Sequence, residues 1–104
     1  MIRHIVLIRF REDVPLTVIA DIFKDLVALT DKLPGVRSIT CGTSDSPEKM
    51  ERGYMHGFVV DFEDGAALEG YQDDADHRVI GGRLIENAVG GRDGILVFDL
   101  PVGE

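Results

Sequence analysis

Two segments of this chain alternate like β-strands and are apolar on both of their faces. Residues 2–10 place these side chains on one face: Ile2, His4, Val6, Ile8 and Phe10. Their opposite face is apolar at its centre, where Ile5 and Leu7 lie between two arginines. Residues 54–62 repeat the pattern, with one face made by Tyr54, His56, Phe58, Val60 and Phe62. Strands of this kind are covered on both sides. The fold must therefore supply two apolar surfaces to one sheet.

The chain between and after these strands has helical patterns. From Leu16, apolar residues recur at spacings of three and four, which predicts an amphipathic helix that the Pro-Gly pair at 34–35 ends. A second helix begins in residues 63–71, is interrupted by "DDADH", and resumes over residues 78–89. Gly81 and Gly82 weaken this last segment.

Two further strands complete the pattern, a weaker one at Val36–Thr43 and a last one at Ile95–Leu100, which Pro101 closes. The element order is then βαββαβ, the ferredoxin-like arrangement. Right-handed crossovers give the strand order 4-1-3-2, with the first and third strands at the centre. We therefore expect an α+β fold with a four-stranded antiparallel sheet, as a single domain over residues 1–104.

Two helices cover only one face of such a sheet, although its central strands are apolar on both. The simplest cover for the second face is another copy of the chain, packed sheet against sheet. The sequence thus predicts a homodimer with a shared, barrel-like core.

Charge and composition narrow the classes of partner. A net charge of −8 disfavours nucleic acid and anionic membrane surfaces. Arginines interrupt the apolar N-terminal stretch, so we expect neither a signal peptide nor a membrane span, and a cytoplasmic location. Cys41 is the single cysteine and is interpreted as a strand-packing residue. Neither the glycine pairs nor the acidic residues have the pattern of a phosphate loop or a metal loop, and we expect no cofactor or metal.

The chain has three histidines, His4, His56 and His77, which are candidates for proton transfer near neutral pH. His4 and His56 belong to neighbouring central strands and are in phase with the large apolar residues, so they could face one compartment. His77 follows an acidic run, in which Asp76 could fix the tautomer of its ring. Each strand histidine also has a purely structural interpretation, with both nitrogens hydrogen-bonded inside the protein.

Four stretches, "MIRHIVLIRF", "LPGV", "GYMHGFVVDFED" and "ALEGYQDDADH", resemble the stress-responsive dimeric α/β-barrel family nearly end to end. The last departs from the family's "Y..HPAH" motif, since it keeps only the final histidine. The resemblance implies a dimeric ferredoxin-like barrel with an apolar cavity between sheet and helices. Some members are described with a magnesium ion, and a plant polyketide cyclase of this fold uses histidines as acid and base.

Carried over to this sequence, the resemblance implies catalytic roles for His4, His56, Tyr71 and His77. It implies that the cavity wall, which would bind the ligand, consists of Val6, Ile8, Ile22, Phe23, Leu26, Val27, Phe58 and Val60.

Three functions remain open at this stage. The expected partner is a hydrophobic or phenolic small molecule. The first function is a cofactor-free cyclase, isomerase or lyase that acts on a hydrophobic carbonyl compound by histidine acid–base catalysis. The second is a non-catalytic stress or ligand-binding protein with structural histidines. The third is a cofactor-independent monooxygenase. Catalysis requires that at least two of the histidines present nitrogens to one enclosed apolar cavity.

Overall fold

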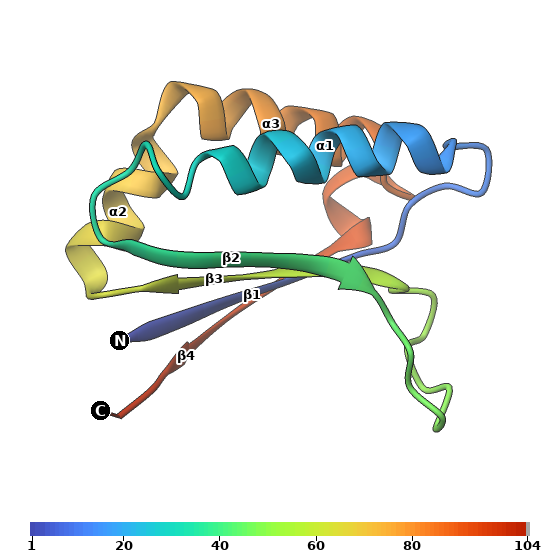
Figure 1. Ribbon diagram of the computed structural model, residues 1–104. Helices are drawn as coiled ribbons and strands as arrows, with labels where there is room; N and C mark the ends of the chain where they lie inside the picture. The colour runs from blue at the N-terminus through green and yellow to red at the C-terminus, as the bar shows by residue number, and fades with distance from the viewer. Residues whose placement is uncertain (104) are drawn as a thin grey trace.

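A computed structural model describes residues 1–103, in which a layer of helices covers one face of an antiparallel sheet (Figure 1). The elements follow one another as β1 (Ile2–Ile8), α1 (Leu16–Ala28), β2 (Val36–Thr43), β3 (His56–Phe62), α2 (Gly65–Asp73), α3 (Ala75–Asn87), the short 3-10 helix η1 (Gly91–Gly94) and β4 (Ile95–Pro101). Across residues 1–103 the sheet has four strands in the order β2-β3-β1-β4, which is the predicted order read from its other edge. The expected α+β, ferredoxin-like fold is confirmed.

Both central strands are shorter than their sequence patterns suggest. β1 ends at Ile8 because the next residue turns away to the chain after α3: Arg9 donates its N–H to the carbonyl of Gly94 and accepts from Val89. Phe10 then makes an isolated bridge with Ala88. β3 begins at His56 rather than at residue 54.

The break between α2 and α3 is sharper than predicted. It consists of Asp74, whose extended backbone ends α2 and whose carboxylate accepts the N–H of His77. This is an N-cap, in which an aspartate satisfies a free N–H of the first helical turn. His77 therefore lies in the first turn of α3, and not in an irregular break.

The core lies between the helices and the sheet. The strand face predicted to carry the large apolar residues does so: Val6, Ile8, Phe58, Val60 and Phe62 are all at most 4 % exposed. The helices contribute Ile22 and Leu26 from α1 and Ile80 and Leu84 from α3. The His4 side chain also lies on this inner face. Among residues 1–103 it is the one polar or charged residue that is buried.

The opposite face of the sheet is apolar and uncovered in the isolated chain. Leu7 of β1 and Leu96, Phe98 and Leu100 of β4 are exposed there, Phe98 by 61 %. Residues 44–55 extend beyond the sheet on the side away from the helices (Figure 1). Within residues 1–103 no helix is long and apolar enough to cross a membrane.

Gly35 lies in the turn between Pro34 and the first residue of β2, and this turn requires glycine. Its φ is +80°, and a Cβ there would lie 2.5 Å from the Cβ of Ala67 in α2. Gly35→Ala should lower the free energy of unfolding by about 2–4 kcal/mol, from left-handed strain and overpacking together. Urea unfolding measures this, with Gly42→Ala as the matched control, since a Cβ at Gly42 meets nothing within 4 Å. Equal effects of the two substitutions would contradict this explanation.

Candidate functional site

A cavity of about 410 Å³ lies between α3 and the inner face of β1 and β4. Its wall is formed by His4, Val6, Phe58, Tyr71, Gln72, His77, Gly81, Leu84, Ile85, Arg92, Ile95 and Val97. A larger hollow of about 620 Å³ involves Ile5, Leu7, Met55 and Leu96. It belongs to the uncovered apolar face, and we take the smaller cavity as the candidate site because three of the candidate catalytic residues line it.

The register of β1 with β4 gives His4 a carboxylate partner. His4 lies opposite Asp99, and its Nδ1 is 2.5 Å from Asp99 Oδ1. An ionised carboxylate only accepts, so Nδ1 carries the proton and Nε2 keeps a free lone pair. In the described part of the chain the ring has no hydrogen-bond partner besides Asp99. Asp99 thus fixes the orientation of the His4 ring through Nδ1.

Tyr71 and His77 place two unsatisfied polar atoms beside this ring. The Tyr71 ring lies 5.6 Å from that of His4 and 3.8 Å from that of His77, measured between centroids. Tyr71 Oη and His77 Nδ1 are both buried and have no hydrogen-bond partner in residues 1–103. An unmet buried polar atom costs about 1–3 kcal/mol. Both residues line the cavity.

Burial also sets the protonation of this pair. It raises the pKa of Tyr71 well above its ordinary value, so the phenol stays an O–H donor at neutral pH. Burial, reinforced by the nearby His4, lowers the pKa of His77 below 6.5. His77 is therefore a neutral imidazole at pH 7, with one nitrogen that accepts and one N–H that donates a hydrogen bond.

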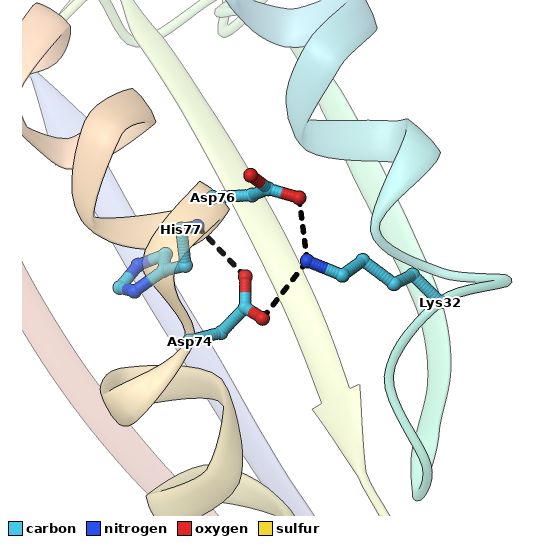
Figure 2. A network of polar contacts seen from close by, with 4 residues as sticks. All are labelled: Lys32, Asp74, Asp76 and His77. Atoms are coloured by element: carbon cyan, nitrogen blue, oxygen red, sulfur yellow. Dashed lines mark hydrogen bonds and ion pairs between the residues drawn. The ribbon is translucent and has the colours of Figure 1, made fainter.

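The acidic run before His77 holds the start of α3 in place (Figure 2). Lys32, in the segment between α1 and β2, lies 3.0 Å from Asp74 Oδ1 and 2.5 Å from Asp76 Oδ2. The second Asp74 oxygen accepts the His77 N–H at 2.9 Å. That bond and Lys32 hold the pKa of Asp74 below its ordinary value. Asp76 thus binds Lys32. No hydrogen bond joins it to the imidazole of His77 in residues 1–103, although the sequence had suggested that Asp76 could fix the tautomer of that ring.

His56 lies apart from the other two histidines. His56 lies on the same face of the sheet as His4. The antiparallel register sets His56 opposite Ile8, however, whereas His4 is opposite Val60. Four strand residues separate the two positions, or roughly 13 Å. His56 packs instead on Phe10, with ring centroids 5.3 Å apart, and burial lowers its pKa. The structure therefore brings together His4, Tyr71 and His77, without His56.

Only some of the residues expected to form the cavity wall line this cavity. Val6 and Phe58 line the cavity. Ile8, Ile22, Leu26 and Val60 are fully buried core residues, Phe23 packs on Phe10 and Phe58, and Val27 is 42 % exposed. The wall implied by the resemblance includes four residues of α1, whereas the helix that lines this cavity is α3. The spacing of His77, Gly81, Leu84 and Ile85 at 0, 4, 7 and 8 could have revealed this helix face.

Asp99 was also missed by the sequence analysis, although its parity with Ile95 and Val97 sets it on the inner face of β4.

Cys41 takes no part in the site: burial raises the pKa of its thiol to about 11, so it is no nucleophile at neutral pH. Residues 1–103 contain no group of three or more His, Cys, Asp or Glu side chains that could hold a metal ion.

The lowered pKa of His77 gives a pH dependence of known sign. Its folded pKa lies below 6.5, so the unfolded chain binds the proton first as the pH falls. Stability should therefore fall as the pH drops below about 6.5, until the folded pKa is passed. Thermal unfolding between pH 7.5 and 5 should show a smaller drop in Tm for His77→Gln than for the wild type. His56→Gln should also show a smaller drop in Tm than the wild type, because burial lowers the pKa of His56 as well. An unchanged pH slope in His77→Gln would contradict the burial assigned to its ring.

Comparisons with known proteins agree with this fold. A dimeric ferredoxin-like protein of unknown function from Jannaschia sp. CCS1 is 32 % identical over 97 % of this chain and 98 % of its own, with a TM-score of 0.91. A dimeric ferredoxin-like protein of unknown function from Thermobifida fusca is 20 % identical, with a TM-score of 0.79 over 97 % of this chain and 90 % of its own. A hydroxynitrile lyase from Passiflora edulis is 20 % identical, with a TM-score of 0.85 over 99 % and 94 %.

The two likenesses at 20 % identity show the fold alone. No curated protein matched the sequence. The model of the stress responsive A/B barrel domain, however, matches residues 2–102, nearly the whole chain. The chain belongs to the stress responsive A/B barrel domain family.

Proposed function

We propose that this protein is a cofactor-free enzyme that removes a proton next to the carbonyl group of a hydrophobic compound. The observation that carries the proposal is that His4, Tyr71 and His77 line one apolar cavity, with His4 hydrogen-bonded to Asp99. Cavities of this kind, with a few convergent polar groups, are the usual form of small-molecule sites.

Each group has a distinct role in this chemistry. The free Nε2 of His4 accepts the proton from the α-carbon, and Asp99 stabilises the imidazolium that forms. The Tyr71 hydroxyl donates a hydrogen bond to the oxygen that becomes negative in the enolate. The His4 imidazolium then returns the proton to the intermediate, and neutral His77, whose ring is tilted against that of Tyr71, hydrogen-bonds to the bound molecule. Each such step contributes on the order of 10²–10⁴ in rate.

An enolate formed here has three productive fates. It can attack a second carbonyl of the same molecule, which is a cyclase reaction; it can be reprotonated elsewhere, which is an isomerase reaction; or a bond beside it can break, which is a lyase reaction. One neighbour of similar fold is named a hydroxynitrile lyase. That name does not choose between them.

A ligand-binding role without catalysis is the second candidate. It is favoured by the burial of His4, which is 6 % exposed and has its ring edge against Phe62 and Tyr71. A purely structural His4 would hold the sheet through Asp99 and leave the cavity as a binding pocket. Enolate formation separates the two candidates, because binding alone does not speed it.

We further assign the uncovered sheet face to a second copy of the chain. Leu7, Leu96 and Phe98 form a continuous apolar surface there, and two similar structures are dimeric ferredoxin-like proteins. Sheet-to-sheet packing would bury this surface in a homodimer. The cytoplasmic location stays a prediction from the sequence.

Exchange of α-protons for deuterium tests the catalytic proposal without knowledge of the final product. A panel of aryl ketones and aryl 1,3-diketones in D₂O is followed by proton NMR. The wild type should speed exchange for at least one compound. Asp99→Asn should lower that rate on the order of 10²-fold, because the ring tautomer of His4 is no longer fixed.

Gly81 provides the matched test of the cavity. A Cβ at Gly81 meets nothing within 4 Å, and Gly81 lines the cavity, whereas its neighbour Gly82 is exposed. Gly81→Leu should fill the cavity and abolish exchange, and Gly82→Leu should keep it. Exchange that survives in Gly81→Leu, or no exchange above buffer for the wild type with any compound, would overturn the catalytic proposal.

Sedimentation velocity tests the dimer. The wild type should sediment as a dimer at micromolar concentration, and Phe98→Glu should weaken the dimer at least about tenfold by placing a charge in a buried apolar interface. Val79→Glu is the control, since Val79 of α3 is 65 % exposed on the helix layer and Phe98 is 61 % exposed on the open sheet face. A monomeric wild type would contradict the assignment.

A further inference from the structure

The candidate cavity is elongated, and its two ends differ chemically. His77 and Ile85 both line it and lie eight residues apart in α3, a separation of roughly 12 Å along the helix. His4, Tyr71 and Gln72 belong to the His77 end. Arg92 of η1 and Ile95 at the start of β4 belong to the other end.

The stretch between the two ends is apolar. Val6, Phe58 and Val97 line it from the sheet, and Leu84 lines it from α3. Gly81 adds no side chain to this wall, and a Cβ there would meet open space. A ligand that reaches from one end to the other therefore needs an apolar body.

Arg92 is the basic residue of the cavity wall, and it has no acidic partner within residues 1–103. Arg3, Lys32 and Arg83 each pair with an aspartate, in a chain that has nineteen acidic residues. The Arg92 side chain makes no ion pair or hydrogen bond within residues 1–103. An unpaired guanidinium at the rim of an apolar cavity is suited to an anion, and its planar fork matches a carboxylate.

We propose that the ligand of this cavity is an elongated apolar carboxylate, whose acid group binds Arg92 and whose opposite end lies between His4, Tyr71 and His77. The assignment of the reacting end to the histidines rests on the proposed function; the assignment of the acid group to Arg92 does not. A single arginine balances one negative charge. In a chain of net charge −8, that favours a monoanionic carboxylate over a dianionic phosphate.

Calorimetric titration with defined probes tests the proposal. The long probes are 6-phenylhexanoate and its primary amide, which differ in charge but hardly in shape, and the short pair is phenylacetate and phenylacetamide. The wild type should bind 6-phenylhexanoate at least about tenfold more tightly than the amide, as one charge-assisted pair allows. The preference should shrink as salt is added. The short pair should show little preference, because its carboxylate cannot reach Arg92 from the histidine end.

Two variants identify the residue responsible. Arg92→Gln should remove the preference for the long acid while leaving amide binding and the Tm unchanged. Lys24→Gln removes the same charge from an exposed position on α1, outside the cavity wall, and should keep the preference. Gly81→Leu should abolish binding of both long probes, which ties the measurement to this cavity.

Failure of this proposal can be told apart from failure of the proposed function. If acid and amide bind the wild type equally, if neither binds at millimolar concentration, or if Arg92→Gln keeps the preference, the carboxylate assignment is overturned. If the Arg92-dependent preference is present but no ketone exchanges its α-protons, the ligand class stands and the catalytic proposal falls.

Discussion

The hydrogen bond between His4 and Asp99 is the contact on which the site depends. It joins the first strand of the chain to the last, across ninety-five positions of sequence, and it exists because β1 and β4 pair in one register. A shift by one residue would turn one of these side chains to the open face. That register directs one nitrogen of His4 to a carboxylate and leaves the other for chemistry. The core therefore fixes the geometry of the base.

Residue parity predicted more of the fold than of the site. Alternation in β1 and β3 gave the inner and outer faces and the need for a second cover, and the order of elements gave the strand order. Parity carries no information on antiparallel register, however. His56 is on the predicted face but opposite Ile8, at the far end from His4. For the same reason Asp99, with the right parity, could not be paired with His4 from sequence alone.

The second half of the site depends on a helix start that local chemistry dictates. Asp74 caps α3 through the N–H of His77, and Lys32 holds that aspartate from the segment after α1. This places His77 against Tyr71 and leaves a buried polar atom of each without a hydrogen-bond partner in residues 1–103. Such atoms are costly in a core that serves only stability, and a bound ligand would remove the cost. The same cavity continues to Arg92, so its shape and its charges indicate one elongated ligand.

The central claim is that His4 holds its proton on Nδ1 and presents a bare Nε2 to the cavity. Long-range proton–nitrogen NMR of the ring nitrogens at pH 8, assigned with His4→Gln, observes this directly. We expect a protonated Nδ1 and an unprotonated Nε2 for His4, and loss of that preference in Asp99→Asn. A His4 ring that carries its proton on Nε2 in the wild type would contradict the account.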